Sequence, residues 1–464
     1  MKIFNTFSKK KEKFTPIKAG EVSMYVCGPT VYDLAHLGHG RAAVSMDLIR
    51  RYLEYKGHKV TFVSNITDVD DKIIKRAAQE GISEKELSER IIPEYEKDYA
   101  ALNVLPPTNK PRATEYIKQM VELVETLISK GFAYATADGV YFEVSKFREY
   151  GKLSGQKLDE LQSGARIAVD DKKKSPLDFA LWKAAKEGEP AWDGPSGMRG
   201  RPGWHIECSA MSKALLGETF DIHGGGADLI FPHHECEIAQ SEAANGTQFV
   251  RYWVHNGHVM VNSEKMSKSL GNFTTLQDIF KKYNPLVVRY LLISTHYRQP
   301  LNFTPEVLEQ AKNSLQRIHD FARSLKTGYE DLPEKIDEVK LMIEVKHEIK
   351  GFEEMMDNDF EVSGALAQVF NLITTVNGLR KSGKLVKGDV DEAEKFLQDV
   401  DKVLGLIFVE ERALAEDIEK LISERNEVRK NRDFKRSDEI RAELEKRGII
   451  LEDSKEGTTW KRAL

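Results

Sequence analysis

The segment between residues 22 and 66 constrains the fold more than any other part of the chain. Residues 22–28, VSMYVCG, have the pattern of a short buried strand that ends at a glycine. Apolar residues then recur at helical spacing up to a helix end at Gly57: Ala42, Met46, Ile49 and Leu53. Residues 59–66, KVTFVSNI, alternate like a second strand. A strand, a helix and a strand in this order form a βαβ unit, which predicts a parallel sheet.

This unit lies in a chain of 464 residues, which is too long for one compact core and predicts several domains. We expect an α/β domain over residues 1–310, with an insertion at about 95–200. Long, charged amphipathic helices with few glycines follow, which predicts an all-α helical bundle over residues 311–404. Residues 405–464 end in a stretch with strand character and predict a small mixed subdomain.

The expected insertion contains residues that interrupt regular structure. Three prolines precede a predicted helix over residues 112–130: Pro106, Pro107 and Pro111. Residues 132–144, FAYATADGVYFEV, look like a hairpin that turns at Ala-Asp-Gly. Glycines and prolines crowd residues 188–203, and residues 204–260 alternate strand-like and helical pieces that would complete the sheet.

The composition, with 41% hydrophobic and 31% charged residues, is that of a soluble globular protein. No stretch approaches the roughly 20 apolar residues of a membrane span. The N-terminal segment MKIFNTFSKKKEKF has a basic run with no apolar core after it, so we expect no signal peptide, a cytoplasmic protein and no membrane partner. The net charge of −5 provides no global attraction to nucleic acid, so any RNA contact must come from local basic surface.

A candidate phosphate-binding sequence, His36-Leu37-Gly38-His39, falls where the first strand gives way to the first helix. Helix N-termini offer unpaired N–H groups and a positive dipole, which favour phosphate. Two imidazoles three residues apart face the same way on a helix and can donate to phosphate oxygens. Gly38 lets a nucleotide approach the backbone.

A second candidate is the run Lys265-Met266-Ser267-Lys268-Ser269. Two lysines and two serines on a mobile loop can close on a triphosphate and neutralise charge as the transition state forms. An exposed loop without function often has the same composition. Chance is a much poorer explanation, however, when this run and the His-x-Gly-His sequence occur in the same chain.

Three cysteines, an odd and sparse set, do not predict a disulfide framework. Candidate metal ligands come from three separate segments: Cys27, Cys208, His233 and Glu237. His233 and Glu237 are i and i+4 on a helix, so they share a face, and two cysteines, a histidine and a carboxylate suit a tetrahedral zinc site. From the residues alone, His234 could replace His233 and Cys236 could replace Glu237. Two buried cysteines beside a capped helix are the alternative to a metal site.

The two phosphate-handling sequences, HLGH and KMSKS, resemble the signature motifs of class I aminoacyl-tRNA synthetases, with Leu37 in place of the isoleucine usual in HIGH. The surroundings of the candidate ligands resemble the cysteinyl-tRNA synthetase family in particular: MYVCGPTVYDLAHLGHGR, GRPGWHIECSAM and FDIHGGGADLIFPHHECEIAQS. The resemblance continues to GTTWKR and so covers essentially the whole chain. Cys236 is a departure, because relatives often have asparagine there.

The resemblance implies a Rossmann-type parallel-sheet catalytic domain that is split by an insertion. It also implies one zinc ion per chain, held by the four candidate ligands: Cys27, Cys208, His233 and Glu237. A thiolate binds zinc far better than a hydroxyl does, so this ion would select cysteine over serine without an editing domain. The implied residues of the cysteine pocket are Thr67, Trp204, His223 and Asp228. Asp228 would pair with the substrate ammonium group, and Trp204 would form a wall beside the small side chain.

The implied reaction has two steps. The cysteine carboxylate attacks the α-phosphate of ATP and releases pyrophosphate, and the terminal ribose of tRNA(Cys) then attacks the adenylate. The catalytic and ATP-binding residues would be those of the two motifs: His36, Gly38, His39, Lys265 and Lys268. The histidines would hold phosphates, the lysines would stabilise the transition state, and Mg²⁺ would accompany ATP.

The C-terminal half carries the implied RNA contacts. Residues 425–436, RNEVRKNRDFKR, are typical of a solvated basic helix and also suit RNA phosphates, with Trp460 available for stacking. By resemblance, the bundle and the C-terminal subdomain are the anticodon-binding region of a monomer. A cysteine ligase of thiol-cofactor biosynthesis is one rival: it would deliver cysteine to an amino sugar and lack a complete anticodon region. The other is a non-catalytic RNA-binding relative, which would usually have lost the motifs that are intact here.

Overall fold

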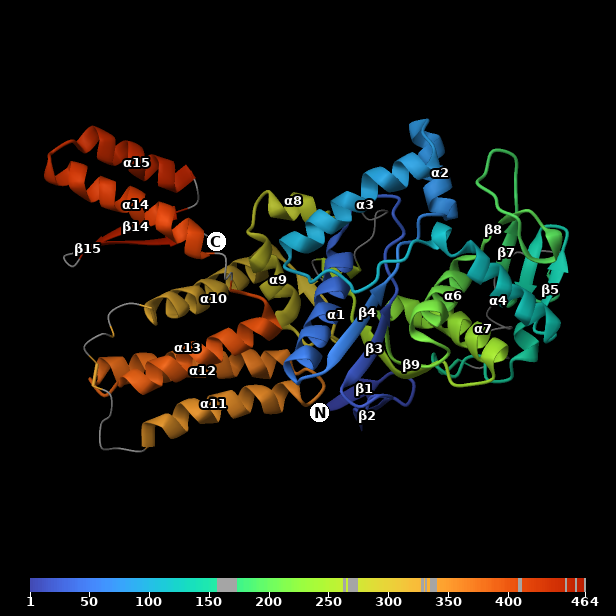
Figure 1. Ribbon diagram of the computed structural model, residues 1–464, viewed down its shortest axis with the longest axis horizontal. Helices are drawn as coiled ribbons and strands as arrows, with labels where there is room; N and C mark the ends of the chain where they lie inside the picture. The colour runs from blue at the N-terminus through green and yellow to red at the C-terminus, as the bar shows by residue number, and fades with distance from the viewer. Residues whose placement is uncertain are drawn as a thin grey trace. The chain divides into compact units, whose positions relative to one another are not determined.

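The computed structural model describes residues 1–156, 173–261, 264–265, 274–326, 329, 332–333, 340–407, 411–446, 449–454 and 457–462 (Figure 1). Its internal contacts divide the chain into two units. The first comprises Met1–Lys281, Leu292–Phe303 and Glu353–Ala365. The second comprises Lys282–Leu291, Thr304–Phe352 and Leu366–Leu464. Each unit is therefore built from segments that are distant in sequence.

A four-stranded sheet forms the centre of the first unit, and neighbouring strands pair in parallel. The strand order is β10-β9-β3-β4, with the bounds β3 Glu21–Val26, β4 Lys59–Ser64, β9 Phe220–Gly226 and β10 Val250–Asn256. Helix α1, Leu37–Tyr55, connects β3 to β4, which confirms the predicted βαβ unit and the parallel sheet. Strands β9 and β10 are buried along almost their whole length, as expected where both faces of a parallel sheet are covered.

A buried arginine anchors helix α1. Arg41 is 1% exposed, and its guanidinium donates to the backbone carbonyls of Leu292, Thr295, His296, Tyr297 and Gln299. These carbonyls follow or end helix α9, Pro285–Ser294, where a helix leaves its last carbonyls without partners. Burial lowers the pKa of Arg41 to about 10, so the guanidinium remains charged at neutral pH. The arginine thereby ties the start of α1 to the segment that leads into strand β13, Leu301–Phe303.

Two capped helices follow β4: α2 Asp71–Glu80 and α3 Glu84–Ala101. Asp70 caps α2 by accepting the N–H of Lys72 at 2.8 Å. Ser83 caps α3 by accepting the N–H of Glu86 at 3.2 Å. The caps fix where each helix begins after the strand.

A second, antiparallel sheet lies inside the sequence range expected as an insertion, with strand order β5-β6-β7-β8. Its strands are β5 Ala133–Thr136, β6 Gly139–Phe142, β7 Phe179–Ala184 and β8 Gly200–Pro202. Strands β5 and β6 form the hairpin predicted for residues 132–144. Three helices contribute to the apolar cluster around this sheet: α4 Ile117–Ser129, α6 Trp204–Leu216 and α7 Glu235–Asn245. Helices α6 and α7 therefore connect this cluster to the central sheet.

Short elements complete the first unit. Strands β1, Lys2–Asn5, and β2, Lys10–Lys13, form a hairpin. Strand β11, Val259–Val261, pairs with β12, Glu264–Lys265, and with β13. Helix α8 covers Leu276–Phe280. The sheet β12-β11-β13 thus links the end of the central sheet to the segment that Arg41 holds.

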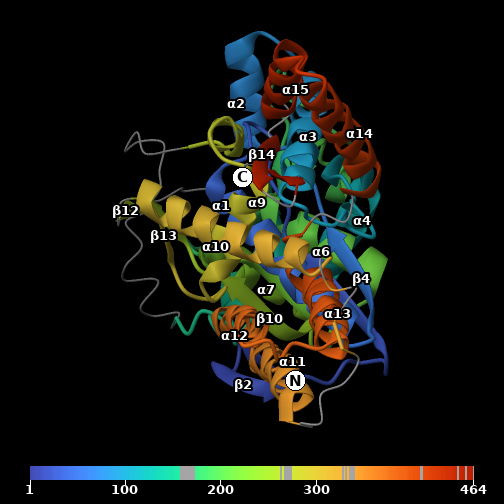
Figure 2. The same cartoon turned by 90° about the vertical axis from the view of Figure 1, so that its left-hand side faces the viewer.

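Long helices make up the second unit. They are α10 Pro305–Ser324, α11 Lys340–Met356, α12 Val362–Lys381, α13 Lys387–Leu404, α14 Glu411–Lys430 and α15 Phe434–Lys446. The end of α11 and the start of α12 fall within the residues of the first unit. Helices α11, α12 and α13 run side by side in both views, and the Phe352 ring lies 5.8 Å from that of Phe396 (Figures 1 and 2). Helices α14 and α15 share an apolar cluster with the hairpin of β14, Ile449–Ser454, and β15, Gly457–Arg462. The helical region and the mixed C-terminal piece expected from the sequence are confirmed.

None of the helices in the described part of the chain combines the length and the apolar character needed to span a bilayer.

We predict that Arg41→Met lowers the free energy of unfolding of the first unit by about 3 kcal/mol or more, because several buried carbonyls lose their donor. Denaturation followed by circular dichroism measures this change. The control is Arg90→Met, since Arg90 is 53% exposed and pairs with Glu80 at the surface. That variant should change the stability by less than about 0.5 kcal/mol. Equal losses in the two variants would show that the buried guanidinium does not anchor α1.

Candidate active site and metal centre

A cavity of about 760 Å³ opens at the carboxyl ends of the parallel strands in the first unit. Residues at or just beyond the ends of all four strands line it: Val26, Ser64, Gly226 and Asn256. The loop after β3, the N-terminus of α1 and helix α3 form other walls. This edge of the sheet is where ligands bind in open α/β folds.

The two histidines of the His-x-Gly-His sequence lie at the N-terminus of α1 and line the cavity. His36 is the N-cap, and its Nδ1 accepts the N–H groups of Gly38 and His39 at 3.1 and 3.4 Å. The N–H of His36 donates in return to His39 Nδ1 at 3.2 Å. The two rings stack with their centroids 3.7 Å apart. Both side chains are thus held at a helix N-terminus, where the helix dipole favours anions.

The lysine-serine motif is described only where it begins. Lys265 ends strand β12, and Lys268 lies outside the described residues. Before the motif in sequence, Val259 of β11 lines the cavity. After the motif in sequence, the N–H of Leu276 donates to the carbonyl of Ala35 at 2.9 Å. Ala35 directly precedes the His-x-Gly-His sequence. The chain that enters and leaves the motif therefore lies beside the cavity and the first motif.

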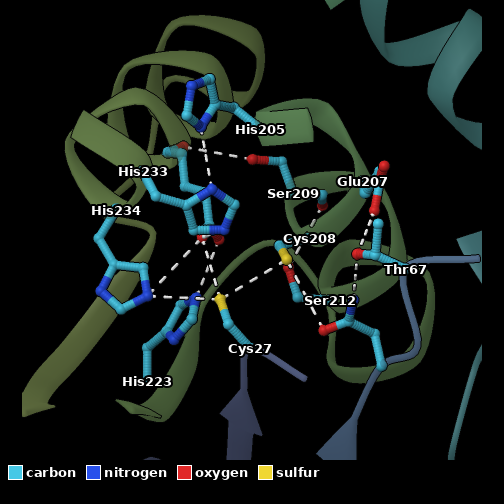
Figure 3. A network of polar contacts seen from close by, with 12 residues as sticks. Cys27, Thr67, His205, Glu207, Cys208, Ser209, Ser212, His223, His233 and His234 are labelled. Atoms are coloured by element: carbon cyan, nitrogen blue, oxygen red, sulfur yellow. Dashed lines mark hydrogen bonds and ion pairs between the residues drawn. The ribbon is translucent and has the colours of Figure 1, made fainter. Parts of the chain in front are cut away.

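The four predicted metal ligands lie together just beyond the end of β3 (Figure 3): Cys27, Cys208, His233 and Glu237. Each offers one ligand atom, and these atoms lie within 4.8 Å of one another. The Cys27 Sγ is 3.6 Å from the Cys208 Sγ and 3.4 Å from the Glu237 Oε1. Three of the side chains are buried, whereas Cys27 is partly exposed and lines the cavity. These four residues, called the metal group below, therefore border the cavity through Cys27.

The surroundings of His233 fit a metal ligand. Its Nε2 lies 3.0 Å from the Glu237 Oε1, but it has no hydrogen-bond partner among the described residues although the residue is 1% exposed. Its Nδ1 lies 2.9 Å from the His205 Nδ1, which orients the ring. A metal ion bound there would satisfy this buried ring nitrogen, which lacks a hydrogen bond and lies among two sulfurs and a carboxylate. The residues present therefore fit a metal that prefers thiolate and imidazole ligands.

A second combination of side chains is equally compact: Cys27, His223, His234 and Glu237. It shares Cys27 and Glu237 with the first, so the two combinations cannot each hold their own ion with a full set of ligands. His234 Nε2 is 3.3 Å from the Cys27 Sγ, and its Nδ1 lies 2.8 Å from the His255 Nε2. The sequence left His233 and His234 as alternatives, and the structure brings both to the group.

Cys236 belongs to neither combination. It is buried, and its Sγ lies 3.4 Å from the hydroxyl of Tyr150. Burial, against a lowering contribution from Tyr150, raises the pKa of the Cys236 thiol. The open alternative in which Cys236 replaces Glu237 as a ligand is not supported by this placement.

The charges of the metal group stabilise one another. Burial would raise the pKa of Glu237, but the neighbouring His223 and His233 lower it to about 2. Burial would lower the pKa of His233, but Glu237 and Cys208 raise it to about 10. Burial would likewise raise the pKa of Cys208, but the Cys27 thiol that donates to its sulfur and the His233 imidazole lower it to about 6. Burial raises the pKa of Cys27 itself. These directions favour the ionised forms of the Glu237 carboxylate and the Cys208 thiol, which are the forms that bind a metal ion.

The four predicted pocket residues divide into two pairs. Trp204 and Asp228 line the cavity. Trp204 is 37% exposed, and its ring lies 4.1 Å from that of His233. Thr67 and His223 are not among the residues that line the cavity, and they are 1% and 0% exposed. The hydroxyl of Thr67 donates to Glu207 at 2.7 Å (Figure 3). The Nε2 of His223 lies 2.9 Å from the Glu237 Oε2. These two residues thus support others beneath the surface of the cavity.

Sequence reasoning missed several residues that shape the site. His205 contacts His233, and the hydroxyl of Tyr95 on α3 lies 3.4 Å from the Nδ1 of His39. Asn65 accepts the N–H of Gly28 at 2.9 Å and so holds the loop that carries Cys27. His205 lies three residues before Cys208, which is a weak signal. Tyr95 lies in a helix with the spacing of a core residue and gives no signal at all.

The chain is similar to proteins of known family along its whole length. Residues 13–313 match the family described as tRNA synthetases class I (C) catalytic domain, residues 351–409 match the DALR domain, and residues 411–460 match the cysteinyl-tRNA ligase anticodon binding domain. It is 51% identical to a cysteine–tRNA ligase from Geobacter metallireducens, over 99% of each chain. It is 49% identical to a cysteine–tRNA ligase from Lachnoclostridium phytofermentans, over 100% of each chain.

Among solved structures, a methionyl-tRNA synthetase of Mycobacterium tuberculosis in complex with methionyl-adenylate matches with a TM-score of 0.63. The identity is 16%, and the match covers 83% of this chain and 90% of that chain. This likeness concerns the fold, and it confirms the Rossmann-type class expected from the sequence.

We predict that Gly28→Ala destabilises the first unit by about 3 kcal/mol, because a Cβ there would lie 1.6 Å from the carbonyl oxygen of Asn65. Thermal unfolding followed by circular dichroism measures the change. The control is Gly378→Ala on α12, where a Cβ meets no atom within 4 Å, and this variant should be neutral or slightly more stable. A Gly28→Ala protein as stable as the unchanged chain would contradict the close contact between the two strand ends.

Proposed function

The chain belongs to the cysteinyl-tRNA synthetase family, and from that premise we propose that it activates L-cysteine with ATP and transfers the cysteinyl group to the 3′ end of tRNA(Cys). One observation carries the proposal: Cys27 of the metal group and both histidines of the phosphate-handling motif line the same cavity. An amino acid held by its thiol and a nucleotide held by its phosphates can therefore meet there.

In the first step the cysteine carboxylate attacks the α-phosphate of ATP, and pyrophosphate leaves. His36 and His39 hold phosphate oxygens at the N-terminus of α1, and Gly38 allows the nucleotide to approach the backbone. Lys265 and Lys268 neutralise the charge that develops in the transition state, and Mg²⁺ accompanies ATP. Positioning and charge neutralisation carry this step, because phosphoryl chemistry requires little covalent participation by the protein.

The metal would be zinc, one ion per chain, and the residues that would hold it are Cys27, Cys208, His233 and Glu237. When bound, zinc supplies the discrimination between a thiol and a hydroxyl, because thiolate is much the better ligand. Asp228 pairs with the ammonium group of the substrate, and Trp204 limits the size of the side chain. Thr67 and His223 act indirectly, by orienting Glu207 and Glu237.

The acceptor is tRNA rather than an amino sugar. The C-terminal matches to a DALR domain and to an anticodon binding domain support this choice, because a ligase that acts on a small acceptor does not need them. We assign residues 1–310 to catalysis, residues 311–404 to the anticodon-binding bundle and residues 405–464 to anticodon recognition. The chain acts as a monomer. In the second step the terminal ribose hydroxyl of the tRNA attacks the adenylate and AMP leaves.

We predict that the protein catalyses exchange of pyrophosphate into ATP with cysteine, and with serine or alanine at least about 200-fold more slowly. A pocket that selects by shape alone discriminates such small differences by no more than about that factor. The measurement is the exchange rate with each amino acid before and after zinc is removed by a chelator. Chelation should abolish exchange with cysteine. Exchange that proceeds equally well with serine would contradict selection by a metal.

Substitution of the cysteines distinguishes the proposed zinc ligand Cys208 from Cys236, which is not a ligand. We predict that Cys208→Ser weakens zinc binding by more than about 100-fold, since even residues that only orient a ligand contribute up to that factor. Cys236→Ser is the matched control, because Cys236 is equally buried but contacts Tyr150 instead of the metal group. It should retain one zinc ion per chain in elemental analysis. Loss of zinc from Cys236→Ser and not from Cys208→Ser would reverse the assignment.

A further inference from the structure

The two histidines at the start of α1 cap the helix, and this cap defines where their protons lie. His36 Nδ1 accepts two backbone N–H groups, and His39 Nδ1 accepts the N–H of His36 at 3.2 Å. A backbone N–H is always a donor, so the Nδ1 of each ring must be the acceptor. In a neutral imidazole the proton is then on Nε2. Each ring therefore presents an Nε2–H donor.

A residue outside the motif makes a second contact with the same nitrogen. The hydroxyl of Tyr95, on α3, lies 3.4 Å from the Nδ1 of His39, and the two rings meet edge to face with centroids 5.4 Å apart. Because this Nδ1 already accepts a backbone N–H, the tyrosine hydroxyl must be the donor. Tyr95 is 4% exposed, and burial raises its pKa well above the ordinary value, so the hydroxyl keeps its proton.

Helix α3 holds Tyr95 independently of α1. The ring of Tyr99 lies 5.8 Å from that of Tyr95, at 89°, and supports it from the next turn. The neighbouring carboxylate of Glu94 accepts from the side chain of Gln277, on α8, at 2.7 Å. Helix α3 therefore contacts both the first motif and the helix that follows the lysine-serine motif. The orientation of His39 depends on this tertiary contact as well as on its own helix.

We propose that Tyr95 is a positioning residue for His39: by donating to Nδ1 it holds the ring in the orientation in which Nε2–H donates toward the phosphates of ATP. The inference rests on the proposed function for the identity of the anion, but the orientation of the ring does not depend on it. No proton is transferred in this role: the Nε2–H remains on the ring and donates a hydrogen bond. Without the tyrosine, the ring keeps only one of the two hydrogen bonds to its Nδ1 and is held less firmly in this orientation.

The test compares Tyr95→Phe with Tyr52→Phe. Tyr52 also lies on a helix of this site, α1, and its buried hydroxyl donates to Asp357 at 2.8 Å, so it controls for the loss of one tyrosine hydrogen bond. In pyrophosphate exchange we expect Tyr95→Phe to lower kcat roughly five- to tenfold, the rate equivalent of one hydrogen bond, with the KM for cysteine unchanged. Tyr52→Phe should leave kcat unchanged. In a His39→Ala background, Tyr95→Phe should have no further effect.

The second readout is NMR of the protein labelled with ¹⁵N-histidine, in which the His39 signals are identified by their absence in His39→Ala. Both the unchanged protein and Tyr95→Phe should show His39 protonated on Nε2, because the N–H of His36 fixes the tautomer in both. The Nδ1 signal of His39 should shift in Tyr95→Phe, because a hydrogen bond to that nitrogen is lost. An unchanged kcat together with an unchanged His39 spectrum would overturn the inference, and so would equal losses of kcat in Tyr95→Phe and Tyr52→Phe. If the unchanged protein showed no exchange with cysteine, the proposed function would fail, whereas the NMR result would still decide the role of Tyr95.

Discussion

The carboxylate of Glu237 is the interaction on which the rest of the site depends. It is fully buried, and a buried charge is tolerated only when it is paired and hydrogen-bonded. One oxygen lies near His233 and Cys27, and the other lies 2.9 Å from His223. These partners come from β9, from the loop after β3 and from the turn before α7. The need to compensate one charge therefore brings three separate segments to the same point at the edge of the sheet.

That point lies beside the N-terminus of α1, with its two histidines, because both are built on β3. Cys27 directly follows this strand, and the loop after it leads to His36 at the helix N-terminus. A parallel sheet places the ends of its strands at one edge, so the candidate metal ligands and the N-terminus of α1 become neighbours without further structure. Trp204 and Asp228, which come from more distant segments, also line the cavity.

Much of this fold could be predicted from hydrophobic periodicity and from the glycines and prolines that interrupt helices and strands. The βαβ unit at residues 22–66, the hairpin at residues 132–144 and the C-terminal helices each follow from local patterns that the tertiary structure does not override. How deeply a side chain is buried could not be predicted in the same way. His223 lies in the middle of β9 and Thr67 lies in the loop after β4, and both are buried beneath the cavity surface, whereas periodicity indicates only which face a residue takes.

The choice between His233 and His234 was also beyond the sequence. The chain before α7 is extended at Phe231, so helical geometry does not describe how the two rings are aimed, and both reach the metal group. Cys236, by contrast, lies within the helix and faces the cluster that contains Tyr150. The contact of Tyr95 with His39 joins two helices and leaves no local trace in either.

The most direct test of the account is whether the substrate thiol binds the metal of this group. The protein would be prepared with cobalt in place of zinc, and its absorption recorded while cysteine, serine or alanine is added. The account predicts that cysteine alone increases the thiolate-to-metal charge-transfer absorption, because a third sulfur joins Cys27 and Cys208. An unchanged spectrum with cysteine, at concentrations that support pyrophosphate exchange, would contradict it.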